Sequence, residues 1–203
     1  MALLRISDIQ RDPGCVTSLA VLRDGRLLTI RPLTPGDAAM VGRYFLSVSE
    51  ELKSLYGPHP FDQATADQLC AEAGGEQPGH LRLIGVLPDG EVIAYFILQL
   101  TVPDHEIERY AGYGITINSE TTCRIAPSVL DAYQNQGIGS PIMAQAFDIA
   151  RRMGYEHILL QEGVFGHNLR ARHFYSKMGF HEVGIFVPSW SAGRPCNDMM
   201  VDL

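Results

Sequence analysis

The first half of the chain alternates short apolar runs with turn residues. Residues 16–22 and 26–33 are two strand-like runs separated by Asp24-Gly25, a pair typical of two-residue hairpin turns. Residues 81–87 and 91–102 repeat this arrangement around a second turn that ends in glycine. The pattern therefore predicts two hairpins.

Between and after these hairpins the periodicity is helical and then irregular. Residues 38–55 predict one helix, and residues 62–73 predict a second, shorter helix. Residues 103–114 are polar, acidic and rich in tyrosine, and they predict a loop. Residues 121–130 are strand-like, but Pro127 cannot donate to a sheet ladder, so we expect a bulge or an interruption there.

The second half of the chain changes to alternating helix and strand. An apolar stripe at helical spacing follows residue 140 and ends at Gly154. A buried-type strand over 157–161, a helix over 168–177 and a strand over 180–187 complete the pattern. The order of elements predicts an α/β fold of the α+β kind, with a mixed sheet and helices on both faces.

Composition narrows the class of protein without naming its chemistry. The 203 residues are 46% hydrophobic and 19% charged, which is typical of one globular domain. A net charge of −7 argues against nucleic-acid binding, which needs a basic face. No apolar run reaches the ~20 residues of a membrane helix, and the N-terminus lacks a signal peptide's apolar stretch. We therefore expect a cytoplasmic protein without membrane contact.

The cysteines and histidines do not predict a metal site. The four cysteines are spread along the chain with no CxxC pair, which favours reduced, mostly buried thiols. His167 and His173 have a spacing that does not place both side chains on one face of a helix. We therefore expect no bound metal.

Residues 133–140 lie between a predicted strand and the amphipathic helix. Gly137 and Gly139 allow the backbone to turn tightly and approach a ligand, and the N-terminus of the following helix favours phosphate. Met143 replaces the third glycine of a dinucleotide fingerprint, and no Gly-Lys-Ser/Thr of a Walker loop follows. Taken alone, this glycine pair is equally compatible with a plain tight turn.

Two motifs together resemble the GCN5-related N-acetyltransferase (GNAT) superfamily. Gln134-Asn135-Gln136-Gly137-Ile138-Gly139 is similar to its acyl-CoA signature, Arg/Gln-x-x-Gly-x-Gly/Ala. Residues 168–180 are similar to the family pattern Asn-x-x-Ala-x-x-Phe-Tyr-x-Lys-x-Gly-Phe. The resemblance covers residues 128–181 and implies a mostly antiparallel central sheet that is splayed in the middle. It also implies an acyl-CoA N-acyltransferase domain over 27–203, preceded by an extension, residues 1–26, that holds the first hairpin strand.

The resemblance implies a role for each motif residue. Backbone amides from Gln136 to Ser140 would hold the pyrophosphate of coenzyme A, and Gln134 would brace the loop. Val129 would pair its backbone with the pantetheine amides, and Asn168 would hydrogen-bond to the same arm. The implied cofactor is acetyl-CoA, and the implied cofactor-binding residues are Val129, Gln134, Asn135, Gln136, Gly137, Ile138, Gly139, Ser140 and Asn168.

Two residues are candidates for proton transfer. By the resemblance, Tyr175 would stand by the sulfur and protonate the departing thiolate, a role that suits a phenol still protonated at neutral pH. Glu162 follows the strand before Asn168, near where some relatives place a carboxylate base. A water relay without any single base is an alternative. As candidates for the general base, four other acidic residues rank below Glu162, namely Asp104, Glu106, Glu108 and Glu120.

The resemblance implies an N-acetyltransferase that moves acetyl from acetyl-CoA to a primary amine by direct attack in a ternary complex. The acceptor is expected to be a small-molecule or peptide amine. We expect the acceptor site to be lined by residues 56–61 and 103–114, whose acidic and aromatic side chains suit a cationic amine. Because dimers are common in the superfamily, we also consider a homodimer. Two alternatives stay open: a non-catalytic acyl-CoA-binding sensor, and a nucleotide-phosphate-binding protein that uses the same glycine loop.

Overall fold

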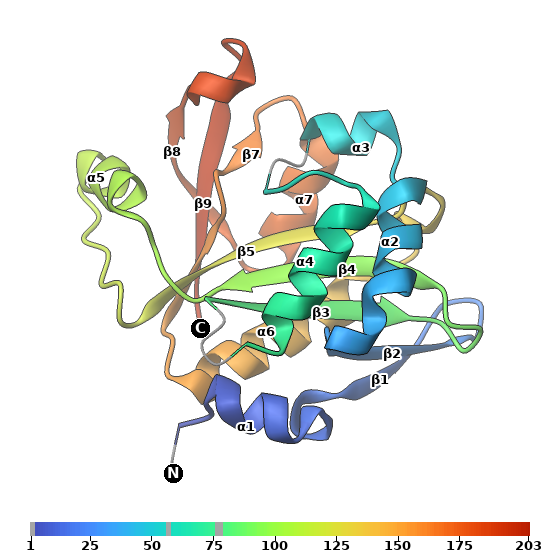
Figure 1. Ribbon diagram of the computed structural model, residues 1–203. Helices are drawn as coiled ribbons and strands as arrows, with labels where there is room; N and C mark the ends of the chain where they lie inside the picture. Colours follow the sequence, from blue (N-terminus) through green and yellow to red (C-terminus); the bar gives the residue numbers. More distant parts are fainter. Residues whose placement is uncertain (1–2, 56–57, 76–78) are drawn as a thin grey trace. The chain divides into compact units, whose positions relative to one another are not determined.

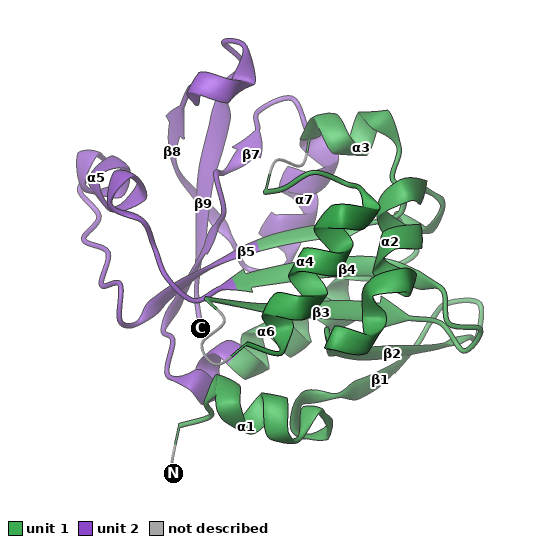
Figure 2. Cartoon of the chain, in the orientation of Figure 1, with its two compact units in different colours: residues 1–98, 126–149 green, residues 99–125, 150–203 purple. Residues whose placement is uncertain are grey.

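The computed structural model describes most of the chain, which divides into two compact units (Figures 1 and 2). Unit 1 comprises residues 1–98 and 126–149, and unit 2 comprises residues 99–125 and 150–203. None of the helices within the described residues is long and apolar enough to cross a membrane. The described ranges are 3–55, 58–75 and 79–203.

The sheet of unit 1 is built from the two predicted hairpins. In the first hairpin Val21 lies opposite Leu27, and Gly25 between them has a φ of 85°, as a tight turn of this kind requires. Gly90 has the same φ in the second hairpin. Both hairpins are therefore confirmed. In order across the sheet, the strands are β1 (Ser18–Val21), β2 (Leu27–Pro32), β3 (His80–Val86), β4 (Val92–Gln99) and the end of β5 (Thr122–Val129).

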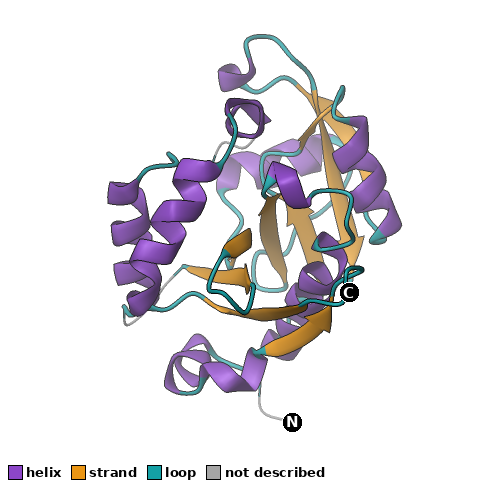
Figure 3. Cartoon of the chain, turned by 90° about the vertical axis from the view of Figure 1, so that its right-hand side faces the viewer, coloured by secondary structure: helices purple, strands orange, loops and turns teal. Residues whose placement is uncertain are grey.

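Helices cover both faces of the unit 1 sheet. α2 (Ala38–Ser47) and α4 (Gln63–Ala73) lie side by side on one face (Figures 1 and 3). There they bury an apolar cluster that includes Ile84 of β3. Its neighbour Gly85 points to the other face, where a Cβ would lie 3.1 Å from the Ile142 side chain in α6 (Gly139–Met153).

Residues 38–55 form two helices rather than the single helix expected. α2 ends at Ser47, and Val48 takes an extended conformation (φ −66°, ψ 128°) in which its side chain is buried. The Ser49 side chain then accepts a hydrogen bond from the Leu52 N–H in the first turn of α3 (Glu50–Leu55). A buried valine and a capping serine thus end one helix and begin the next.

A short helix that the periodicity did not indicate, α1 (Ile6–Arg11), precedes the first hairpin. The Gln10 side chain donates to the carbonyls of Ala73 and Gly75, at 3.1 and 2.7 Å, where α4 ends. The N-terminal extension is therefore tied to the rest of unit 1. The domain boundary at residue 26 stays a prediction.

The sheet of unit 2 is mixed, with antiparallel pairs in the majority. The start of β5 runs parallel to β6 (His157–Leu160), with Thr122 opposite His157. β9 (Cys196–Asp202) runs antiparallel to β6, to β7 (Val164–Phe165) and to β8 (His181–Phe186). The predicted fold class, a mixed α/β structure with a mostly antiparallel sheet, is confirmed.

Residues 103–114, expected to be a loop, form the helix α5 (Asp104–Gly112). The loop prediction was wrong because this helix turns polar side chains inward. Glu106 and Tyr110, one turn apart, are both 0% exposed. Because its buried face is held by ion pairs and a tyrosine, the helix shows no apolar stripe in the sequence.

Of the two alternatives expected at Pro127, a bulge or an interruption, the interruption is absent: β5 continues through Pro127 as one strand. Its pairing with β6 ends with Ile125 opposite Leu160, and the Gln161 N–H donates to the Ile125 carbonyl at 3.0 Å. Pro127 follows the last residue of this ladder, so its missing N–H removes no hydrogen bond from it.

Candidate active site

The loop between β5 and α6 adopts the backbone conformation that its glycine and asparagine favour. A single 3-10 turn, Asp131–Tyr133, leads into Gln134. Asn135 (φ 61°) and Gly137 (φ 84°) both take left-handed conformations. The Gln134 side chain donates to the Val129 carbonyl at 2.9 Å, so a motif residue holds the loop from within.

The loop leads directly into the N-terminus of α6, with Ile138 buried as an anchor. A Cβ added to Gly137 would lie 3.6 Å from Nε and 4.0 Å from Nη2 of Arg23, and it would meet no other described atom within 4 Å. Arg23 is an exposed residue of the turn between β1 and β2. A left-handed glycine with only a flexible guanidinium group beside it suits a phosphate group, and so do the unpaired N–H groups of a helix N-terminus.

In unit 2 the second motif forms α7 (Leu169–Lys177) and both of its ends. Asn168 Oδ1 accepts a hydrogen bond from the Ala171 N–H at 3.1 Å. Asn168 is thus the helix cap, and its Nδ2 is a donor that the cap does not use. Gly179 follows the helix with a φ of 94°, the left-handed conformation common at helix C-termini.

Tyr175 of α7 is a buried phenol. Its ring lies 5.5 Å from that of Phe174 and 5.7 Å from that of Phe180, measured between centroids. Burial raises the pKa of Tyr175 well above its ordinary value. The hydroxyl therefore keeps its proton throughout the neutral range, as a proton donor must.

Glu162 lies in an insertion between β6 and β7. Leu159 of β6 pairs with Met200 of β9, and Val164 of β7 pairs with Asn197 of β9. Between these two pairs the chain from β6 to β7 advances five residues, whereas β9 advances three. Glu162 has a φ of 54°, and the glycine after it has a φ of 67°. A left-handed backbone conformation is uncommon for glutamate. Here it occurs where the chain between β6 and β7 has two more residues than the opposing segment of β9, as in a β-bulge.

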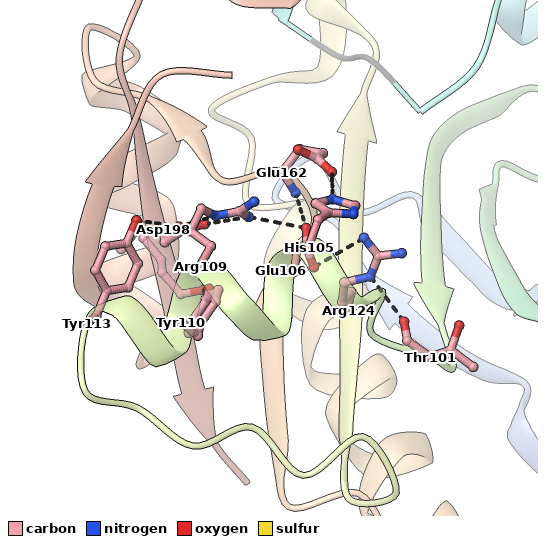
Figure 4. A network of polar contacts seen from close by, with 10 residues as sticks. Thr101, His105, Glu106, Arg109, Tyr110, Tyr113, Arg124, Glu162 and Asp198 are labelled. Carbon is pink, nitrogen blue, oxygen red and sulfur yellow. Dashed lines mark hydrogen bonds and ion pairs between the residues drawn. The ribbon is translucent and has the colours of Figure 1, made fainter. Parts of the chain in front are cut away.

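A network of buried charged groups lies beside Glu162 (Figure 4). Glu106 accepts a hydrogen bond from the Glu162 N–H at 3.1 Å, and its oxygens lie 3.4 Å from Arg109 and 3.2 Å from Arg124. Arg109 donates to both oxygens of Asp198, at 2.7 and 3.2 Å. The network thereby joins α5, β5, β9 and the insertion that carries Glu162.

Burial sets the proton affinities within this network. It raises the pKa of Glu106 and of Asp198, although the arginines beside them oppose the shift. Burial also works against the charge of Arg109, but Asp198 and Glu106 outweigh it, and the pKa of Arg109 is raised. The side chains of Glu106 and Asp198 are 0% exposed, whereas that of Glu162 is 32% exposed. Of these three carboxylates, Glu162 is the one that meets solvent.

Glu162 faces a cavity of about 270 Å³ in unit 2. His105 Nε2 lies 3.1 Å from Glu162 Oε1 at its edge. The Phe186 ring forms part of the wall and is covered by Arg109, whose guanidinium carbon lies 3.9 Å from the ring centroid. The lining residues are His105, Arg109, Glu162, Phe186, Pro188, Ser189 and Trp190.

His105, Glu106 and Glu162 offer three potential metal-ligand atoms within 4.8 Å of one another. Both Glu106 oxygens, however, already face guanidinium groups. A divalent cation bound there would be repelled by the guanidinium groups of Arg109 and Arg124, which already neutralise the Glu106 carboxylate. We therefore assign this cluster to the ion-pair network.

A sequence profile described as the acetyltransferase (GNAT) family matches residues 46–180, a range that contains both motifs. The chain belongs to this family. No curated protein sequence matches the chain.

Solved GNAT structures share this fold. The GNAT domain of PAT from S. lividans is 22% identical, with a TM-score of 0.71 over 94% of this chain and 99% of that one. RimJ from Mycobacterium smegmatis, in complex with CoA-disulfide, is 16% identical, with a TM-score of 0.69 over 92% and 86% of the two chains. Ribosomal-protein-S5-alanine acetyltransferase from Vibrio fischeri is 13% identical, with a TM-score of 0.69 over 86% and 92%. At these identities the likeness shows the GNAT fold alone.

The GNAT motif residues are divided between the two units. Val129 and residues 134–140 belong to unit 1, whereas Glu162, Asn168 and Tyr175 belong to unit 2. The structure places the first group in one continuous segment, from the last residue of β5 to the first turn of α6. It places Asn168 and Tyr175 on one helix and Glu162 in the insertion before it.

The acidic residues ranked below Glu162 have other surroundings. Glu106 is buried in ion pairs, and Asp104, Glu108 and Glu120 are exposed. Of the expected acceptor segment 56–61, the first two residues, Tyr56 and Gly57, lie outside the described residues.

The sequence predictions named Glu162 and placed residues 103–114 beside the acceptor, a range that contains His105 and Arg109, but they did not name either residue. They did not include Trp190 or the rest of the wall from 186 to 190 of this GNAT protein. One signal was present in the sequence: Glu106, Arg109 and Tyr110 have the three- and four-residue spacing of a helix face. Trp190, the one tryptophan of the chain, carried no motif.

Proposed function

We propose that the protein is an N-acetyltransferase that moves acetyl from acetyl-CoA directly to a primary amine in a ternary complex. The observation that carries the proposal is the loop over 134–139. It matches the family's acyl-CoA signature and has a left-handed Gly137 at a helix N-terminus, where an added Cβ would contact only the flexible Arg23 side chain. Membership of the acetyltransferase family supports the same activity.

In this proposal the chain's own groups hold acetyl-CoA. Backbone amides from Gln136 to Ser140 bind the pyrophosphate, with Asn135 and Ile138 shaping the loop and Gln134 bracing it against Val129. The Val129 backbone and the Nδ2 group of Asn168 bind the pantetheine amides. The bound cofactor supplies an activated acyl group on a thiolate leaving group.

Two side chains move protons in the proposed reaction. Tyr175, which burial keeps protonated, gives its proton to the departing thiolate, and the proton lost from the nitrogen of the tetrahedral intermediate restores the phenol. Glu162 accepts the proton that the attacking ammonium must lose. His105, 3.1 Å from Glu162 and 60% exposed, gives that proton a route to solvent.

A binding module without turnover is the weaker candidate. A sensor needs the phosphate loop but has no use for a buried phenol and an exposed carboxylate. The chain carries Tyr175 and Glu162 as well as the loop.

The proposal is tested by incubating the protein with acetyl-CoA and a panel of amines, measuring thiol release and the mass of the acetylated product. We expect turnover with at least one primary amine. We also expect acetyl-CoA to raise the melting temperature by mass action, whereas NAD and ATP leave it unchanged. A shift with acetyl-CoA but no turnover across amino acids, polyamines, amino sugars and peptide N-termini would favour the sensor. A shift with ATP or NAD alone would favour a nucleotide-phosphate-binding protein.

A further inference from the structure

The ion-pair network beside the cavity of unit 2 contains one more carboxylate than guanidinium groups. It contains three carboxylates (Glu106, Glu162 and Asp198) and two guanidinium groups (Arg109 and Arg124). Glu106 and Asp198 are fully buried and ion-paired with the arginines. The carboxylate without an arginine partner in this network is Glu162, whose side chain is 32% exposed. A cation at Glu162 would balance the network.

One part of the wall, formed by Phe186, Pro188 and Trp190, is apolar and aromatic. Trp190 is 50% exposed, and its ring stands edge-on to Phe165, with centroids 5.4 Å apart and an interplanar angle of 80°. Phe186 and Pro188 continue the surface. A rigid aromatic wall beside one carboxylate suits an ammonium group attached to an apolar body.

We propose that this cavity is the acceptor site and that it selects primary amines with an apolar body and no carboxylate beside the amine. The inference deepens the proposed function and rests on it. In the bound state the ammonium faces the Glu162 carboxylate, and the apolar body lies on Trp190 and Phe186.

Arg109 does not offer a substrate carboxylate a free counter-ion. Its Nε and Nη2 donate to Asp198, Glu106 lies 3.4 Å away, and its planar face covers Phe186. A second carboxylate in the cavity would meet a network that is already negative. An α-amino acid therefore binds more weakly than the amine that lacks its carboxylate.

Trp190 makes the test direct, because it is the one tryptophan in the chain and it lines the cavity. Its fluorescence is titrated with 2-phenylethylamine and with phenylalanine, which share a body and differ in the carboxylate. Titrations are run with and without coenzyme A. We expect a saturable change with the amine and an affinity at least about 10-fold lower for phenylalanine. The kcat/KM for acetyl transfer is expected to show the same preference.

Two variants assign the preference to Glu162. Glu162→Gln keeps the shape and removes the charge, so it should weaken binding of 2-phenylethylamine about 5- to 10-fold and abolish most of the preference. Glu156→Gln removes the same charge from an exposed position of unit 2 outside the cavity lining. It should bind both ligands like the wild type.

The outcomes separate this inference from the proposed function. Equal affinity for the two ligands, a preference that survives in Glu162→Gln, or acetylation of 2-phenylethylamine without any Trp190 response would overturn the inference and leave acetyl transfer standing. If the titrations show tighter binding of 2-phenylethylamine than of phenylalanine but no amine is acetylated, the cationic-amine site would be supported and the proposed acetyltransferase activity would be overturned.

Discussion

The two units offer ligands different kinds of contact. Between Gln134 and Ser140, unit 1 presents backbone amides and no titratable side chain. Unit 2 presents a buried phenol, an exposed carboxylate and a buried ion-pair network. A backbone site depends on φ angles and open space, whereas a side-chain site depends on charge and protonation. Substitutions in the unit 1 loop should therefore change affinity for coenzyme A, and substitutions in unit 2 should change turnover or the choice of amine.

The largest effect is expected at Tyr175. Tyr175→Phe deletes one hydroxyl and nearly preserves shape, so folding and coenzyme A binding should change little. If the phenol donates a proton to the thiolate, kcat should fall by roughly 10²–10⁴-fold. Steady-state kinetics and calorimetric titration with coenzyme A would measure the two quantities separately.

A matched control removes a hydroxyl elsewhere in unit 2. Tyr155 donates to the Leu100 carbonyl at 2.8 Å and is outside the proposed site, so Tyr155→Phe should retain turnover.

Because burial raises the pKa of Tyr175, the phenol stays protonated up to about pH 10, and its titration should cause no loss of activity below that pH. Unaltered kcat in Tyr175→Phe, with chemistry rate-limiting, would leave this tyrosine a packing role.

The next largest effect is expected at Gly137, and it should appear in affinity. Gly137→Val would place a branched side chain at φ 84°, in the space proposed for phosphate. Loss of one charge-assisted hydrogen bond, at roughly 1.5–3 kcal/mol, corresponds to roughly 10–100-fold weaker binding of coenzyme A. Calorimetric titration would measure it.

Gly90→Val is the control for backbone strain. Gly90 lies in a hairpin turn of the same unit, with a φ of 85° and nothing within 4 Å of an added Cβ. It should lower stability by a similar amount and leave the affinity for coenzyme A unchanged. Wild-type affinity in Gly137→Val would show that the loop does not hold the cofactor.

The two sites also differ in how far the sequence could predict them. The loop lies within one stretch of chain, and its glycines, polar residues and following amphipathic helix are visible in order. The same holds for the hairpins and for the helix capped by Asn168. Local geometry dictated these elements, so local sequence revealed them.

The cavity could not be predicted in this way. Its walls come from α5, the insertion after β6, the end of β8 and residues 188–190, segments that only tertiary structure brings together. α5 was taken for a loop because its inward residues, Glu106 and Tyr110, are polar. The break at Val48 likewise depends on a buried position in the core.

The smallest effect is expected at Arg23, which extends the backbone site by one side chain. Arg23→Ala should weaken coenzyme A binding about 5-fold, because an exposed ion pair contributes up to about 1 kcal/mol. Arg43→Ala removes the same charge from an exposed position on α2 and should have no effect. The Arg23 contribution should also shrink as salt is raised, since exposed charges are screened. Equal affinities for both variants at low salt would restrict phosphate binding in unit 1 to backbone amides alone.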